Sequence, residues 1–211
     1  MTVTTSKTTY VYIDGFNLYY GALRKTKYKW LDLEKFCQAL LPNDNIASIK
    51  YFTAKVSGLP RDPGEPIRQQ LYLRAIQTSA KVSVVYGHFL THQVYMPVSG
   101  SNPTRWEKVT KTEEKGSDVN LATHLLYDGF KKLYDVAVII SNDSDLREPV
   151  RLVRKELGFP VGIVNPHEIH SKELQEHATF VRRVRTTYLA TSQLPETLKD
   201  ARGTFRKPKE W

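Results

Sequence analysis

A continuous run of apolar, mostly β-branched residues, Val136–Ile140, constrains the fold of this chain more than any other segment. Such a run is typical of a strand buried on both faces, and strands of that kind belong to parallel sheets covered by helices. Helical periodicity flanks the run, in Ser117–Leu133 before it and in Leu146–Leu157 after it, where Gly158 marks a helix end. A strand placed between two helices predicts an α/β fold built on a parallel sheet.

Shorter segments elsewhere repeat this alternation. Further strands are predicted at Tyr10–Ile13, Ser48–Lys55, Val82–Phe89 and Val161–Val164. Further helices are predicted from about Leu18, over Leu31–Leu41, and from Pro66 to Ser79. The length suits one compact domain, which we expect over residues 8–190. We therefore expect a mainly parallel sheet with helices on both faces.

The segment 90–114 departs from this pattern and is interpreted as an irregular insertion. Its two halves, Gln93–Val98 and Thr104–Val109, flank a cluster of turn residues, which favours a β-hairpin. Tyr95 and Trp106 lie in these halves. They can stack on exposed bases, although an aromatic residue in a hairpin more often packs locally.

The composition narrows the class of partner. The net charge of +9 favours a polyanion such as nucleic acid. The basic tail, residues 191–211, is either a solvated end or an arm that contacts phosphates. No apolar run approaches the roughly 20 residues of a membrane helix, and the first residues lack the apolar stretch of a signal peptide. The single cysteine, Cys37, lies on an apolar helical face and fits a cytoplasmic protein. Nothing in the sequence requires a homo-oligomer.

Acidic residues stand where the predicted strands end. Asp14 ends the first strand, and Asp143 and Asp145 follow the strand Val136–Ile140. Parallel strands place their functional sites beyond their carboxyl ends. Asp118 begins the inward-facing stripe of the helix that starts at Ser117, where a carboxylate needs a partner or a metal ion. These positions predict one cluster of carboxylates.

Each of these aspartates also has a structural interpretation. Asp14 can be a turn residue before a glycine, and Asp118 a helix cap. Asp145, with Glu148 three residues later, resembles a capping box. Asp143 is harder to explain as a cap. The joint arrangement is more specific than any single member.

Electrostatics indicates what a carboxylate cluster is for. Two carboxylates about 4 Å apart repel by roughly 4 kcal/mol at an effective dielectric constant near 20. A cation relieves this repulsion, and ligation by oxygen alone favours Mg²⁺ or Mn²⁺. Zinc is disfavoured because there is no cysteine pair and the six histidines show no ligand-type helical spacing.

Polar and basic residues complete the predicted site. Asn17 can orient a water or phosphate, or cap a helix, and Ser141 can bind metal or phosphate, or bond to local backbone. Lys115 precedes Asp118 by three residues and can neutralise phosphate charge. Candidate contacts to a nucleic-acid backbone are Arg61, Arg68 and Arg105.

Three segments together resemble the motifs of the NYN domain, a branch of the PIN-like nucleases. They are Tyr-Ile-Asp14-Gly-Phe-Asn17-Leu, Lys115-Gly-Ser-Asp118-Val-Asn-Leu-Ala and Ile-Ile-Ser141-Asn-Asp143-Ser-Asp145-Leu. The resemblance spans about Tyr10 to Val164. It implies a three-layer α/β/α sandwich with a mainly parallel, Rossmann-like (PIN-like) central sheet, and metal-dependent RNA hydrolysis. The implied metal ligands are Asp14, Asp118 and Asp143, with Asp145 as a supporting carboxylate and Asn17 as a polar neighbour.

The sequence therefore predicts a ribonuclease that uses Mg²⁺ or Mn²⁺, with single-stranded RNA as the preferred substrate. The alternative is a catalytically inactive or regulatory RNA-binding protein of the same fold, although binding RNA alone disfavours clustered negative charge. A phosphatase with Asp-x-Asp after its first strand fits poorly, because Asp14 is followed by Gly-Phe. The glycine signature of dinucleotide binding follows none of the predicted strands.

Overall fold

The computed structural model describes residues 7–58, 60, 62–169 and 171–211. Its centre is a six-stranded sheet in the order β3-β2-β1-β6-β7-β8, in which all neighbouring strands are parallel. The strands are β1 (Thr8–Asp14), β2 (Asn45–Thr53), β3 (Val82–Tyr86), β6 (Val136–Ile140), β7 (Val161–Asn165) and β8 (Phe180–Arg183). The predicted parallel sheet is confirmed, with β8 added at one edge.

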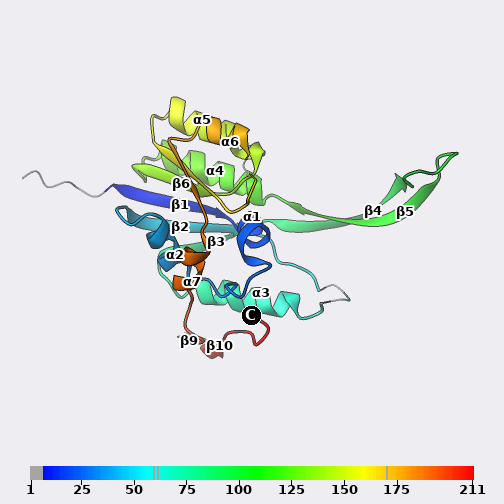
Figure 1. The fold of residues 1–211 in the computed structure, drawn as a ribbon, viewed down its shortest axis with the longest axis horizontal. Coiled ribbons are helices and arrows are strands. Elements are labelled where there is room, and N and C mark those ends of the chain that lie inside the picture. Colours follow the sequence, from blue (N-terminus) through cyan, green and yellow to red (C-terminus); the bar gives the residue numbers. More distant parts are fainter. Residues whose placement is uncertain (1–6, 59, 61, 170) are drawn as a thin grey trace, which may run out of the picture.

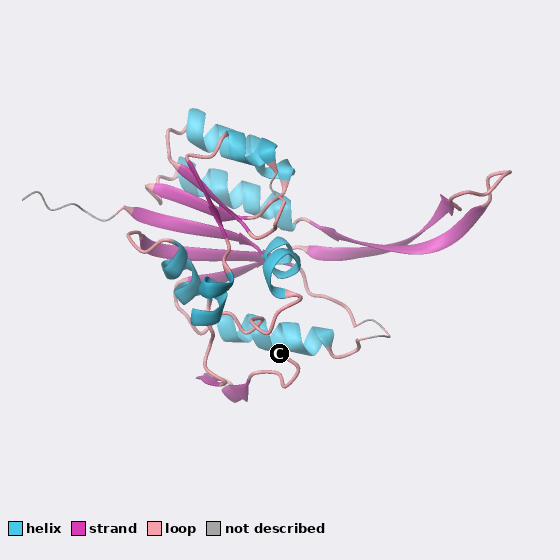
Figure 2. Ribbon diagram, viewed as in Figure 1, coloured by secondary structure: helices cyan, strands magenta, loops and turns pink. Residues whose placement is uncertain are grey.

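Helices cover both faces of the sheet and give three layers (Figures 1 and 2). On one face lie α1 (Gly15–Leu18), the π-helical turn η1 (Tyr19–Leu23), α2 (Leu33–Leu40), α3 (Glu65–Ile76) and α7 (Thr186–Thr191). On the other lie α4 (Ser117–Phe130), the 3₁₀ turn η2 (Ser144–Leu146), α5 (Arg147–Lys155) and α6 (Lys172–Glu176). The predicted α/β/α sandwich is confirmed.

The alternation of side chains along β1 explains why the sheet has a core on each face. Val11 and Ile13 point into the core under α2 and α3, whereas Tyr12 points into the core under α4 and α5. Cys37 is fully buried in the first of these cores, as its helical position predicts. No described helix is both long enough and apolar enough to span a membrane.

The β-hairpin predicted in the segment 90–114 is confirmed, but it is longer and more regular than the expected irregular insertion. Its strands are β4 (His88–Pro97) and β5 (Trp106–Lys115), paired without interruption from His88 opposite Lys115 to Pro97 opposite Trp106. The hairpin projects far from the rest of the protein (Figure 1). The irregularity in the sequence has a physical reason: both faces of the hairpin are open to solvent, so apolar alternation is not required.

The C-terminal tail is ordered, although most of its side chains remain exposed to solvent. The tail forms a second hairpin, β9 (Thr197–Asp200) and β10 (Gly203–Arg206), in which Phe205 is buried. Arg74 on α3 donates hydrogen bonds of 2.7 and 2.6 Å to the carboxylate of Asp200. The ring of Trp211 packs 5.8 Å from that of Tyr72. A few aromatic and ionic contacts therefore hold a segment whose composition is otherwise that of a free end.

Candidate metal centre

The order of the strands defines where a site is expected. The chain passes from β1 outward through β2 to β3, and then returns to β6 on the other side of β1. The direction of winding therefore reverses between β1 and β6, and in open parallel sheets ligands bind at that point beyond the carboxyl ends of the strands. Asp14 is the last residue of β1, and Asp143 follows the end of β6 by three residues.

Three carboxylates meet at this switch point. One oxygen from each of Asp14, Asp118 and Asp143 lies within 4.8 Å of the other two. Asp14 is almost fully buried, and the other two are half-buried. Asp118 arrives from the first turn of α4, on the helix face that packs toward the sheet. The structure thus brings together the three residues that were predicted as metal ligands.

Hydrogen bonds hold Asp14 in place. Its Oδ1 accepts from the backbone N–H of Asn17 at 2.9 Å, so Asp14 is the N-cap of α1. Its Oδ2 accepts from the Asn17 side-chain amide at 2.7 Å and from the Ser141 hydroxyl at 2.9 Å. Asp14 is therefore both a cap and a member of the cluster, and Asn17 is not a cap.

Asp143 also caps a helical turn, which corrects the expectation that it is hard to explain in this way. Its Oδ1 accepts from the backbone N–H of Asp145 at 3.0 Å and thereby begins η2. Its own N–H donates to the hydroxyl of Ser141 at 3.1 Å. Ser141 thus links the carboxylate of Asp14 to the backbone of Asp143, and this link positions the two residues relative to each other.

The predicted capping box at Asp145 is absent, because Leu146 is the N-cap of α5 and no side chain caps it. Asp145 is exposed and lies outside the group of three. Its negative charge nevertheless acts on Asp118. Its supporting role therefore remains a prediction that rests on charge rather than on contact.

Burial and negative charge together perturb Asp118. Burial raises the pKa of its carboxyl to about 7, and the carboxylates of Asp14, Asp143, Glu114 and Asp145 add to this effect. Burial also raises the pKa of Asp14, opposed by its hydrogen bonds with Asn17 and Ser141. Asp14 and Asp118 thus lie side by side and both resist ionisation. A bound cation would relieve this by stabilising their charged forms.

The donor set fits a hard divalent cation. All three groups are carboxylates, and their spacing allows one ion to contact one oxygen of each. The centre can therefore bind a divalent metal ion at the point where α/β sheets place their ligands.

Comparison with known proteins agrees with this geometry. The NYN domain profile matches residues 8–183 of the chain. The chain belongs to the NYN domain family. Its family is generally nuclease-like, and the carboxylates lie within the matched region.

Two other proteins resemble this NYN domain. The chain is 30% identical to the 6-hydroxy-3-succinoylpyridine 3-monooxygenase HspA of Pseudomonas putida (strain DSM 28022 / S16), over 96% of this chain and 75% of that protein. The crystal structure of a protein of unknown function from Vibrio parahaemolyticus RIMD 2210633 superimposes with a TM-score of 0.57 at 16% identity, covering 88% of this chain and 97% of that one. The second similarity concerns the fold alone.

Lys115 and Arg105, two of the basic residues predicted to contact substrate, lie apart from each other in this NYN domain. Lys115 ends β5, with its Nζ 3.6 Å from a Glu113 oxygen. Arg105 pairs with Glu107 at 2.8 Å near the far end of the β4–β5 hairpin. These pairs place Lys115 at the base of the hairpin and Arg105 remote from the three carboxylates.

Arg68 does not join the cluster either. Arg68 forms an ion pair with Asp62 on the α3 side of the molecule. Arg61 lies outside the described residues. The phosphate-binding roles of these arginines remain predictions.

Two residues beside the metal centre, His167 and Glu114, were not predicted from the sequence. His167 Nε2 lies 3.1 Å from Asn17 Oδ1, although 150 residues separate them. Glu114 Oε1 accepts from the backbone N–H of Ser117, the first residue of α4, at 3.1 Å. The N-cap position of α4 is Gly116, so Asp118 is not the cap that the sequence allowed. His167 follows the end of β7 by two residues, so the strand-end rule that identified Asp14 could have found it.

Proposed function

We propose that this NYN domain is a ribonuclease that hydrolyses phosphodiester bonds of single-stranded RNA with Mg²⁺ or Mn²⁺. The observation that carries the proposal is the meeting of Asp14, Asp118 and Asp143 within 4.8 Å at the switch point of a nuclease-like fold. These three carboxylates would hold the ion. When bound, the ion supplies water activation and stabilisation of charge on the scissile phosphate.

The neighbouring polar residues position the ligands. The Asn17 side chain donates to Asp14 and accepts from the N–H of Asn142 at 3.2 Å, so both ends of its amide are occupied within the protein. Asn17 and Ser141 therefore act as positioning residues rather than as phosphate contacts. Partners of this kind typically change metal affinity or activity by about 10- to 100-fold. The exposed Asp145 would orient a water at the ion.

The substrate assignment rests on charge and on exposed aromatic rings. Tyr95 and Trp106 are 66% and 59% exposed, which opposes local packing. They share one face of the β4–β5 hairpin with Lys108. Unstacked bases of a single strand can stack on such rings, whereas paired bases cannot. The buried, single Cys37 fits a protein of the reducing cytoplasm.

The test is cleavage of a labelled single-stranded RNA in Mn²⁺, in Mg²⁺ and in EDTA. We expect cleavage by the wild type with either ion, none with EDTA, and none by folded Asp143→Asn. Asp135→Asn is the matched control, because the carboxylate of Asp135 is exposed, lies outside the cluster and accepts from the N–H of Thr8. RNA that is bound but left intact by the wild type would instead support the RNA-binding alternative.

A second candidate is oxygenation of a small aromatic compound. It is favoured by the Pseudomonas putida relative, whose name describes a monooxygenase of a succinoylpyridine. A small cavity of about 70 Å³ also lies beside Gly15, and aromatic rings such as Tyr51, Tyr72 and Trp211 line it. Mass spectrometry of hydroxypyridines incubated with the protein, reduced nicotinamide cofactor and air tests this candidate. A product heavier by one oxygen atom, formed with the wild type and absent without protein, would favour oxygenation over RNA cleavage as the function.

A further inference from the structure

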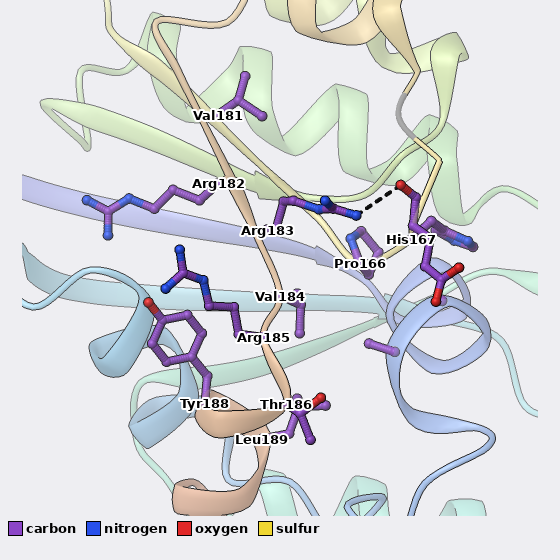
Figure 3. Close-up of a pocket in the computed structure, with 13 residues that line it drawn as sticks. Pro166, His167, Val181, Arg182, Arg183, Val184, Arg185, Thr186, Tyr188 and Leu189 are labelled. Atoms are coloured by element: carbon purple, nitrogen blue, oxygen red, sulfur yellow. Dashed lines mark hydrogen bonds between the residues drawn. The ribbon is translucent and has the colours of Figure 1, made fainter.

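A long groove lies on the surface beside the metal centre. It consists of two hollows of about 750 and 630 Å³. The two share Gly21, Ala22, His167 and Glu168, so they form one continuous depression. The groove passes between η1 and the loop that follows β7, and it ends against the segment from β8 to α7 (Figure 3).

One end of the groove lies next to the metal centre, although none of the three carboxylates lines it. Asn142 lines its near end and immediately precedes Asp143. His167 lines both hollows and contacts Asn17, which in turn holds Asp14. The backbone of η1 lies close beneath His167, since a Cβ added at Gly21 would meet the His167 ring at 2.7 Å. The groove therefore adjoins the metal centre through Asn142 and His167.

Positive charge dominates the groove. The basic side chains that line it are Arg24, Lys25, Arg182, Arg183 and Arg185. Its one acidic lining residue is Glu168. Arg183 donates to the backbone carbonyl of Glu168 at 3.0 Å, which fixes the guanidinium without neutralising it (Figure 3). Arg182 is directed instead to the carbonyl of Leu40.

The remaining cations have no carboxylate partner. Among the described residues, none lies within ion-pair distance of Arg24, Lys25, Arg183 or Arg185. By contrast, Arg74 and Arg151 elsewhere on the surface are paired with acids. Unpaired cations along one concavity attract a polyanion, and release of its counterions favours binding.

An aromatic ring accompanies these charges. Tyr20 lines the groove and is 54% exposed, and the guanidinium of Arg24 lies 5.4 Å from its ring centroid. Stacking on one exposed ring is available to the bases of a single strand but not to those of a duplex.

We propose that this basic groove binds the sugar–phosphate backbone of single-stranded RNA on one side of the scissile bond. The strand would leave the metal centre at Asn142, pass over η1 beside Tyr20, and reach Arg183 and Arg185. This inference rests on the proposed ribonuclease function, because the metal centre defines where the strand begins.

The experiment measures binding separately from cleavage. Asp143→Asn protein is titrated into a labelled single-stranded RNA of about 12 nucleotides, a length within the usual range of single-strand sites. The same titration is repeated with a protein that carries Arg183→Ala and Arg185→Ala in addition to Asp143→Asn. We expect Kd to rise about tenfold or more. The slope of log affinity against log salt should decrease by about 0.7 for each phosphate that the variant no longer neutralises.

The matched control removes the same charge elsewhere. Lys131→Ala with Lys155→Ala takes two cations from the ends of α4 and α5, outside the groove. We expect this pair to change Kd less than twofold. An equal rise in Kd for both double substitutions would mean that net charge alone attracts the RNA. That result would overturn the proposal that the groove binds it. Circular dichroism and thermal unfolding verify that each protein is folded.

The two proposals fail in different ways. If the wild type cleaves RNA and the groove variant binds and cleaves normally, the proposal of RNA binding in the groove is wrong and the proposed ribonuclease function is supported. If the groove variant loses affinity but the wild type never cleaves in Mg²⁺ or Mn²⁺, RNA binding in the groove is supported and the proposed ribonuclease function is wrong.

Discussion

The metal centre and the β4–β5 hairpin adjoin in this protein but are stabilised in opposite ways. Residues that are far apart in the sequence build the metal centre, and a bridge of hydrogen bonds through Ser141 links two of its acids. Residues close in sequence build the hairpin, which packs mainly against itself. The first region therefore depends on the whole fold, whereas the second depends little on it. Substitutions should reveal this difference.

The largest effect is expected for Asp14→Asn. The substitution keeps an oxygen that can cap α1 but removes the charge that a cation needs. We expect RNA cleavage to fall by at least about a hundredfold, since this exceeds the usual effect of a residue one step away from the ion. Single-turnover cleavage rates measure it, with Asp135→Asn as control. Full activity of Asp14→Asn would remove the carboxylates from the mechanism.

A smaller effect is expected for Asn17→Ala. Asp14 then loses one hydrogen bond, and the contact with His167 disappears, but the three carboxylates remain. We expect activity to fall by about 10- to 100-fold, with partial recovery at high Mn²⁺ concentration because the ligands are displaced rather than removed. A Mn²⁺ titration of the cleavage rate measures this. Asn45→Ala, at an exposed strand end, should leave the titration curve unchanged.

The metal-free protein should lose stability as the pH rises. The pKa of Asp118 is raised from its ordinary value to about 7, so the folded state holds a proton that the unfolded state releases. Stability therefore falls between about pH 4 and pH 7. Allowing for solvent screening of a half-buried group, Asp118→Asn should raise the free energy of unfolding at pH 8 by roughly 1–2 kcal/mol.

Urea unfolding of both proteins with EDTA at pH 5 and pH 8 measures this difference. It should shrink at pH 5, and saturating Mg²⁺ or Mn²⁺ should remove it by stabilising the wild type. A difference of equal size at both pH values would show that the cause is packing rather than ionisation.

The smallest effect is expected for Trp106→Ala on stability. The ring is exposed on a hairpin that contributes little to either core. We expect the free energy of unfolding to change by less than about 0.5 kcal/mol. Phe36→Ala, which removes a fully buried ring, should lower it by about 3–5 kcal/mol. Comparable decreases in urea unfolding would mean that the hairpin is part of the cooperative core.

The sequence was sufficient for the central sheet because a continuous apolar run such as Val136–Ile140, placed between two helices, is typical of a strand that is buried on both faces. It was insufficient for β8, a four-residue edge strand in which Arg182 and Arg183 are exposed and no alternation is visible. The tail was missed for a similar reason. Its hairpin depends on contacts such as Arg74 with Asp200, which join residues 126 positions apart.

The acidic members of the site were predictable because strand ends and helix phase fix their places independently of side-chain contacts. The local roles were less predictable. Asp14 and Asp143 are caps as well as cluster members, and a single sequence does not separate two roles that one carboxylate fills at once. His167 reaches Asn17 only through the tertiary structure, so its contact has no local signal.

The junction between β5 and α4 has a mechanical consequence. Only Gly116, with φ of 92°, separates Lys115 at the end of the hairpin from the helix whose first turn carries Asp118. Each hairpin strand is ten residues long, so at about 3.4 Å per residue the arm reaches roughly 34 Å. Only two residues therefore separate the base of this arm from Asp118. A force applied to the arm by a bound molecule would thus act directly on the helix turn that carries this carboxylate.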